Sequence, residues 1–576
     1  MKRWMKYIRP YLPYFIIGPL CMIVEVIGEV VMPKLLSIVI NRANDGVLTV
    51  GNSLGIMAAM VVTAILMMAG GVGGAYFGAK ASVNFAADLR SDVYAKVQRY
   101  SFANIDRFST GSLVTRLTND VTQLQNFVNM LLRMALRAPG MMIAALIMAI
   151  AIRPSLSMIF LVSMPVMLVV IGLVISKGFP RFSRMQGKID NLNSTVQENI
   201  TNVRVVKSFV REDHETAKFR RANRDLKDAG MSAMKVMIFM QPVTTLFMNL
   251  TVLAVILLGG RIVLSGDMPV GDLSAMITYV TQILMSLMMV TMLLMISSRA
   301  MASARRITEV LDEKVDLDDT TAAQPDRLVT DGAVEFRHVS FRYYKNSEGR
   351  VLDDINLTIP AGATVGIIGS TGCGKTTLVS LIARLYDADE GEVLVDGVDV
   401  RDYSLRHLRD GVGMVLQKNT LFSGSIAENL RWGNEQATDA EVQTAAAHAQ
   451  ADKFVSAFPE GYDTLLEQGG TNVSGGQKQR LCIARALLKK PKILILDDST
   501  SAVDTATEAQ IRRAFREDLA GSTKIIIAQR ISSVQEADQI IVMDEGTVTG
   551  IGTHAELLAN NTEYQEIYYS QMEKEA

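Results

Sequence analysis

The sequence has 576 residues and a mass of 63.1 kDa, more than one soluble core of ordinary size, so at least two domains are expected. Hydrophobic residues make up 49% and charged residues only 20%, so part of the chain is predicted to lie in lipid. The net charge of -1 excludes a nucleic-acid binder that depends on bulk charge. Cys21, Cys373 and Cys482 are odd in number and widely spaced, which excludes a disulfide framework.

Six apolar stretches in the first half are long enough to cross a hydrocarbon core. They are residues 14–40, 54–78, 131–152, 155–176, 236–259 and 270–296. Residues 1–310 hold 32 Lys and Arg against 17 acids, and these basic residues gather in the long connecting segments and near both ends of the half. The positive-inside bias therefore places the amino terminus and the second half in the cytoplasm. Residues 1–312 are predicted to form an all-α membrane domain with six spans and long cytoplasmic extensions.

The two long cytoplasmic connections are predicted to be helices that continue out of the membrane. Residues 88–97 and 196–219 are compatible with helix and contain no proline. Each connection has a place where a helical rod can turn, at residues 109–111 and 199–202. These turns are candidate contacts for the second half; the alternative is that the connections are solvated hairpins.

A second domain, of the α/β class, is predicted for residues 329–576, after a linker at residues 313–328 that is rich in acids and small residues. Residues 364–369 form a short apolar strand pattern that runs into a glycine-rich loop and then a helical pattern. The loop and helix start comprise Gly369, Ser370, Thr371, Gly372, Cys373, Gly374, Lys375, Thr376 and Thr377. Such a loop turns backbone N–H groups toward phosphates, Lys375 reaches the terminal phosphates, and the Thr376 hydroxyl binds Mg²⁺. The sequence therefore predicts an ATP site.

Two further strands are predicted to bring polar groups to the same edge of the sheet. Residues 492–496 end in Asp497 and Asp498, and residues 413–416 end in Gln417. Asp497 is expected to hold the magnesium shell. A second anion site is predicted at the glycine-rich start of another helix, at Ser474, Gly475, Gly476 and Gln477. One nucleotide cannot fill both anion sites at once.

These pieces, in this order and spacing, resemble the ATPase domain of ABC transporters, and the whole chain resembles one half of a bacterial ABC exporter. The resemblance implies that Tyr343 stacks on adenine and that Gln417 senses magnesium and the membrane domain. It also implies that Ser474 to Gln477 are the signature motif and that Asp504 belongs to the D-loop. In this family two nucleotide domains form a head-to-tail dimer, so each ATP lies between the phosphate loop of one and the signature of the other. The segments at residues 101–111 and 199–209 resemble the coupling helices of the family.

Two positions depart from the family pattern. Asp498 stands where a catalytic glutamate is usual, and Gln529 stands where a switch histidine is usual. Asp is one methylene shorter than Glu, and Gln cannot accept and return a proton as His can. The pair resembles the degenerate site found in one subunit of heterodimeric multidrug exporters. We therefore expect a weakly hydrolytic site whose signature motif completes the active site of a second half-transporter.

The expected function is ATP-driven export of small amphiphilic or drug-like compounds across a bacterial cytoplasmic membrane, with the nucleotide domain in the cytoplasm. The expected cofactors are ATP and Mg²⁺, and the expected partners are a second ABC half-transporter, a small-molecule substrate and the lipid bilayer, without nucleic acid. The alternatives are a homodimeric exporter or lipid flippase with slow ATPase activity, or a regulatory ATP-bound subunit.

Two sets of residues in the spans are candidates for the substrate cavity. Glu25 and Glu29 are four residues apart in the first span, and carboxylates are expensive in lipid, so they are expected to line the cavity and to favour cationic substrates. Met285, Met289 and Met292 share one face of the sixth span and would form an adaptable apolar wall. The alternatives are pairing of the carboxylates with a neighbouring span and ordinary packing of the methionines. In the phosphate loop, Cys373 is expected to make ATP binding sensitive to alkylation, unless its thiol is inaccessible.

Overall fold

The computed structural model describes residues 2–47, 50–320, 322–343, 349–498 and 505–575, and it divides into two units. The first unit comprises residues 1–97 and 111–312, and the second comprises residues 98–110 and 313–576. Asp504 of the expected D-loop lies outside the described residues.

The first unit is all helical. Its helices are α1 (Lys2–Ile8), α2 (Leu12–Asn44), α3 (Val50–Gln98), α5 (Thr110–Thr115), α6 (Val121–Met134), α7 (Arg137–Ile152), α8 (Pro154–Ser157), α9 (Ile159–Thr201), α10 (Val203–Ser208), α11 (Glu212–Leu264) and α12 (Val270–Asp312). A π-helical turn, Arg116–Asp120, joins α5 to α6. Within the described residues, six helical runs are long and apolar enough to cross a membrane, which confirms the predicted six spans.

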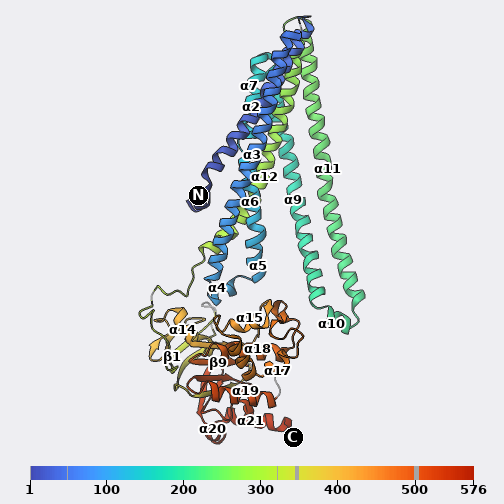
Figure 1. Cartoon of the computed structure of the whole chain (residues 1–576). Coiled ribbons are helices and arrows are strands. Elements are labelled where there is room, and N and C mark those ends of the chain that lie inside the picture. Colours follow the sequence, from blue (N-terminus) through green and yellow to red (C-terminus); the bar gives the residue numbers. More distant parts are fainter. Residues whose placement is uncertain (1, 48–49, 321, 344–348, 499–504, 576) are drawn as a thin grey trace. The chain divides into compact units, whose positions relative to one another are not determined.

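The long helices α9 and α11 lie side by side and are joined by the short helix α10 (Figure 1). The core of the unit is formed by α2, α7, α9, α11 and α12 around the fully buried Tyr279 and Ile283. Within the predicted third span the helix is interrupted, because α6 ends at Met134 and α7 begins at Arg137. Pro139 lies in the first turn of α7, where a missing N–H disrupts no helical hydrogen bond.

Pro33 removes one backbone hydrogen bond from α2 at a position beside α12. Pro33 has no N–H group, so the carbonyl of Glu29, four residues earlier, loses its usual helical donor. The side chain of Gln282 on α12 supplies that donor, with its Nε2 2.9 Å from the Glu29 carbonyl oxygen. The hydroxyl of the neighbouring Tyr279 donates to the carbonyl of Val30 at 2.8 Å. The sixth span is thereby tied to the first at the point where Pro33 removes a hydrogen bond from the continuous helix α2.

The second unit is an α/β domain. Its main sheet has six strands in the order β12-β11-β3-β10-β9-β6, parallel except for the edge strand β12. A second, antiparallel sheet has the order β2-β1-β4-β5, and β7 pairs with β8. The strands are β1 (Val334–Phe341), β2 (Leu352–Ile359), β3 (Thr364–Gly369), β4 (Glu390–Val395), β5 (Val398–Asp399), β6 (Val412–Val415), β7 (Gly424–Ser425), β8 (Leu465–Leu466), β9 (Ile493–Asp497), β10 (Thr523–Ile527), β11 (Gln539–Asp544) and β12 (Thr547–Gly552).

The helices of this unit are α4 (Phe102–Arg107), α13 (Lys375–Ile382), α14 (Leu405–Gly411), α15 (Ile426–Arg431), α16 (Asp439–His448), α17 (Asp452–Val455), α18 (Gly475–Leu488), α19 (Thr505–Asp518), α20 (His554–Asn560) and α21 (Thr562–Glu575). The strands β3, β9 and β10 are central and largely buried, and their parallel carboxyl ends bring three loops to one edge of the sheet. The predicted fold class is confirmed by the six apolar helices and this α/β domain.

The short helix α4 groups with the second unit although the sequence places it between membrane spans. The Phe102 ring lies 6.0 Å from that of Tyr386, and the Tyr386 hydroxyl donates to Asp106 at 2.9 Å. Arg107 forms an ion pair of 2.8 Å with Glu313. The domain boundary expected from the sequence, with residues 1–312 as one domain, therefore differs from the grouping of contacts at residues 98–110.

Candidate functional site

The phosphate loop connects β3 to α13, as the sequence predicts. Gly369 ends β3 with φ 154°, and a Cβ there would lie 1.9 Å from the Met543 carbonyl oxygen, so the close approach of β11 requires glycine. Gly374 has φ 98° and begins α13. The Lys375 ammonium donates to the carbonyls of Gly369 at 2.9 Å and Ser370 at 2.7 Å. Its charge is therefore held against the loop whose N–H groups are suited to phosphate.

Asp497 lies beside Thr376 at the start of α13. The Thr376 hydroxyl donates to Asp497 Oδ1 at 3.0 Å, and the carboxylate is 1% exposed. Among the described residues its second oxygen, Oδ2, is buried without a hydrogen-bond partner. Burial raises the pKa of Asp497, and the Thr376 hydrogen bond only partly opposes that rise. A buried carboxylate oxygen without a donor, next to a hydroxyl, is the oxygen-ligand chemistry that Mg²⁺ favours, so these residues fit the metal.

The two residues that depart from the family pattern contact each other. Gln529 follows β10, Asp498 follows β9, and Gln529 Nε2 donates to Asp498 Oδ2 at 2.7 Å. The side chain of Gln417 also hydrogen bonds to Asp498. Burial raises the pKa of Asp498, and the hydrogen bonds from Gln529 and Gln417 act against that rise. The carboxylate is thus held by two amides, neither of which can accept a proton.

Tyr343 follows β1 and lies near the phosphate loop. Its hydroxyl is 2.9 Å from the hydroxyl of Thr377, and its ring packs edge-on against Phe341 and Tyr386. The residue is 41% exposed, which leaves ring surface free for a planar ligand. Its stacking on adenine stays a prediction.

The signature segment begins α18. Ser474 is the N-cap, its side chain accepts from the N–H of Gln477 at 3.3 Å, and Gln477 Oε1 accepts from the N–H of Ser474 at 2.9 Å. This capping box leaves Ser474 and Gly475 exposed at the amino end of a 14-residue helix. The two predicted anion sites thus lie at the starts of different helices, α13 and α18.

Cys373 is buried at 4% exposure, and its sulfur is 3.6 Å from the Lys375 ammonium. The accessible thiol that alkylation requires is therefore not present at this position in the folded domain. The structure favours the alternative given above, in which Cys373 fills space in the loop.

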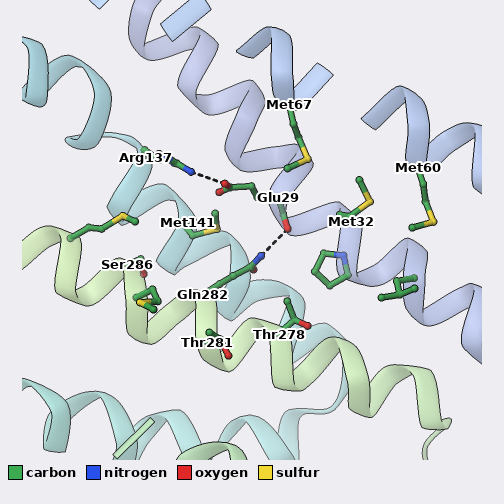
Figure 2. Close-up of a pocket in the computed structure, with 14 residues that line it drawn as sticks. Glu29, Met32, Met60, Met67, Arg137, Met141, Thr278, Thr281, Gln282 and Ser286 are labelled. Atoms are coloured by element: carbon green, nitrogen blue, oxygen red, sulfur yellow. Dashed lines mark hydrogen bonds and ion pairs between the residues drawn. The ribbon is translucent and has the colours of Figure 1, made fainter. Parts of the chain in front are cut away.

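A cavity of about 450 Å³ lies among α2, α3, α7 and α12 of the membrane unit (Figure 2). Its polar end is formed by Glu29, Arg137 and Gln282, and its walls carry six methionines, Met32, Met60, Met67, Met141, Met285 and Met289. Arg137 Nη2 lies 2.6 Å from Glu29 Oε1 and 3.2 Å from Glu25 Oε1. Both carboxylates therefore pair with a neighbouring span. Met292, the third expected methionine, is 49% exposed and is not among the residues that line this cavity.

Sequence reasoning missed Arg137 and Gln282. Arg137 lies inside the predicted third span, residues 131–152, and its position at the first residue of α7 brings it to the carboxylates of the first span. The available signal was a base inside the apolar stretch 131–152 together with Glu25 and Glu29, the only two acids of the stretch 14–40.

Comparisons with known proteins decide the family. The ABC transporter transmembrane region matches residues 15–287, and the ABC transporter nucleotide-binding domain matches residues 352–501. The chain belongs to the ABC transporter family. It is 38% identical over 577 residues to an uncharacterized ABC transporter ATP-binding protein, YfiB, of Bacillus subtilis, covering 100% of this chain and 99% of that protein.

Two further likenesses bear on transport. The chain is 37% identical over 479 residues to a fatty acid ABC transporter ATP-binding/permease protein of Mycobacterium tuberculosis, covering 83% of this chain and 75% of the relative. A bacterial Atm1-family ABC exporter, solved with ATP bound, superposes with a TM-score of 0.81 at 25% identity and covers 97% of this chain and 98% of its own. This ABC transporter is therefore a multi-pass inner-membrane protein with a cytoplasmic ATPase domain and the fold of that exporter, and its ATP hydrolysis is coupled to transport.

Proposed function

We propose that this ABC transporter is the subunit of a heterodimeric exporter that carries the weakly hydrolytic ATP site, and that the exporter moves small amphiphilic compounds. The observation that carries the proposal is the contact between Asp498 and Gln529, which joins both departures from the family pattern at one place beside the phosphate loop. The ATP-binding residues match the family pattern, whereas the two residues expected to act in hydrolysis, Asp498 and Gln529, do not. Slow hydrolysis and long occupancy by ATP follow from that combination.

The residues around the nucleotide divide into those that bind and those that act on water. The phosphate-loop N–H groups and Lys375 hold the phosphates, and Tyr343 offers ring surface to the base. Thr376, Asp497 and Gln417 would hold Mg²⁺, which neutralises the charge on the β- and γ-phosphates when bound. All of these residues are of the type that ATP binding needs.

The step of ATP hydrolysis that we expect to be slow is activation of the attacking water. A side chain at position 498 must accept a proton or polarise the water at a fixed distance, and Asp is about 1.5 Å shorter than Glu. The amide of Gln529 occupies one oxygen of Asp498 and cannot take part in proton transfer. Domain closure on ATP can therefore occur without efficient hydrolysis.

The signature segment has the opposite role. Ser474 and the exposed N–H groups at the start of α18 offer donors to a phosphate that this chain's own loop does not hold. We infer that they complete the active site of the second half-transporter. The name of the mycobacterial fatty acid relative supports an amphiphilic substrate for the pair.

The test is steady-state ATPase activity of the purified complex with its second half. Ser474→Arg is expected to lower activity by about a hundredfold, because it removes an oxyanion donor and adds bulk. Asp498→Asn is expected to change it by less than about twofold, because this site contributes little turnover. Thr438→Arg is the matched control, because it breaks a similar capping box at the start of α16, away from the signature.

Two outcomes contradict the proposal. One is a large loss with Asp498→Asn and little loss with Ser474→Arg. The other is full ATP turnover and transport by this chain purified alone, which would show a self-sufficient homodimer.

A further inference from the structure

Two acceptor oxygens of residues at the polar end of the membrane-unit cavity lack donors among the described residues, and a third lies nearby on Glu25, which is not among the residues that line the cavity. Arg137 Nη2 donates to Glu29 Oε1 at 2.6 Å and forms an ion pair with Glu25 Oε1 at 3.2 Å. Among the described residues, the Oε2 atoms of both glutamates are buried without a hydrogen-bond partner, and so is Gln282 Oε1. Buried acceptors without donors cost free energy, more so when they are charged.

The orientation of Gln282 is set by α2. Its Nε2 donates to the Glu29 carbonyl, the group that Pro33 leaves without a helical donor. A carbonyl oxygen can only accept a hydrogen bond, so the NH₂ group of Gln282 must face it. If the Gln282 amide flipped, this hydrogen bond would be lost. Its Oε1 is therefore fixed as an acceptor at the polar end of the cavity, next to Glu29 (Figure 2).

The nearby bases do not satisfy these oxygens. Arg133, one turn before α7, is exposed and acts on Glu25 through its charge, while the Glu25 Oε2 stays without a partner. Lys34, next to Pro33, pairs with Asp272 at 2.8 Å. The polar end thus needs a group that brings N–H donors and positive charge.

The rest of the cavity suits an apolar body. Six of its fourteen lining residues are methionines, drawn from α2, α3, α7 and α12, and thioether side chains adapt to varied apolar shapes. A volume of about 450 Å³ is within the range of small-molecule sites. A ligand with a charged donor head and a flexible apolar tail matches both ends.

We propose that this cavity binds amphiphiles with a protonated amine head, whose N–H groups donate to Glu29 and Gln282 while the tail packs on the methionines. The inference names the substrate class of the exporter and rests on the proposed function. It assigns recognition to N–H donors as well as to charge, because Glu29 Oε2 and Gln282 Oε1 lack donors among the described residues. It also assigns Arg137 a positioning role, since it holds Glu29 Oε1 and leaves Glu29 Oε2 for the ligand.

Four probes with the same twelve-carbon chain separate these contributions. Dodecylamine has charge and N–H donors, dodecyltrimethylammonium has charge alone, dodecanol is neutral, and dodecanoate is anionic. Their binding to the full-length complex in lipid nanodiscs is measured without ATP, by displacement of radiolabelled dodecylamine, with protein-free nanodiscs correcting for partition into lipid. Dodecylamine is expected to bind at least about tenfold more tightly than each of the others.

Two isosteric variants test the residues. Glu29→Gln should weaken dodecylamine binding by about tenfold, and Glu25→Gln, which acts only through its charge beside Arg137, should weaken it by less. Both variants should leave dodecanol binding within about twofold, which also reports an intact cavity. Asp267→Asn is the matched control, because this exposed acid lies in the loop between α11 and α12, and it should change neither. Should a variant lose both probes, the wild-type series alone decides.

The proposal is overturned if dodecanoate binds as tightly as dodecylamine, which would assign the head group to Arg137. It is equally overturned if the alcohol or the trimethylammonium probe matches the amine, or if both variants keep wild-type affinity for the amine. Because binding is measured without ATP, these results leave the proposed export function standing. Normal amine binding without ATP-dependent transport would contradict the export function alone.

Discussion

Replacing Asp498 by Glu and Gln529 by His should speed ATP hydrolysis at this chain's own site, which we propose to be slow. In the structure the Gln529 amide lies 2.7 Å from Asp498 Oδ2 and holds the short carboxylate toward β10. The first change moves the carboxylate outward by about 1.5 Å, and the second replaces the amide by a group that can donate and accept a proton. The binding residues Lys375, Thr376 and Asp497 are untouched.

The size of the effect follows from this geometry. A misplacement of about 1 Å at a reacting group costs roughly a hundredfold in rate, and a well-placed general base contributes about 10²–10⁴. We therefore expect the double variant to hydrolyse ATP at its own site at least about a hundredfold faster. Asp498→Glu alone should gain less, because Gln529 still occupies the carboxylate. The left-handed backbone at position 498, with φ 47°, adds a stability cost of about 1 kcal/mol for Glu but does not affect the chemical step.

The assay is single-turnover hydrolysis of radiolabelled ATP by the complex, with the partner's consensus site inactivated so that only this chain's site turns over. Asp452→Glu serves as the matched control, since this acid accepts a hydrogen bond from Tyr462 and lies outside the ATP-binding residues. The reasoning is refuted if the double variant binds ATP as the wild type does but hydrolyses it no faster. It is also refuted if the wild-type site already turns over at the rate of the double variant.

Three further predictions concern stability and access. Asp497→Asn should raise the melting temperature of the nucleotide-free domain by about 2–4 °C and abolish the further rise with MgATP, because it removes a buried carboxylate that lacks a donor. The pKa of Asp497 is raised in the folded domain, so the folded domain keeps a proton that the unfolded chain releases, and the wild type loses stability as pH rises from about 3.9 through the raised pKa. Asp497→Asn should lessen this loss. An unchanged dependence of stability on pH would contradict this. Tyr279→Phe should lower the free energy of unfolding by about 1 kcal/mol, measured by thermal unfolding, because the buried hydroxyl donates to the carbonyl of Val30 near Pro33. An unaltered melting temperature would argue against a stabilising role of this hydrogen bond. Maleimide should label Cys373 only after unfolding, as followed by mass spectrometry of the digested protein; rapid labelling of the native chain that ATP prevents would show an accessible thiol.

Local patterns in the sequence were sufficient for the spans and the phosphate loop. Apolar runs of membrane-crossing length and the strand, glycine loop and helix around Lys375 are contiguous, so each is determined by neighbours along the chain. The carboxyl ends of parallel strands meet at one edge, which is why Asp497 could be assigned to the same edge as the loop.

Contacts between distant segments were decided only by the tertiary structure. Gln529 contacts Asp498, 31 residues away, because β9 pairs with β10. The side-chain rotamers that bring the two groups together cannot be predicted from either motif. The sequence offered Glu25 and Glu29 as a face of one helix, but it could not show that Arg137 begins a new helix beside them or that Gln282 donates to the carbonyl freed by Pro33. A helix face is set by periodicity within one segment, whereas the partner of a buried charge is set by how separate helices pack.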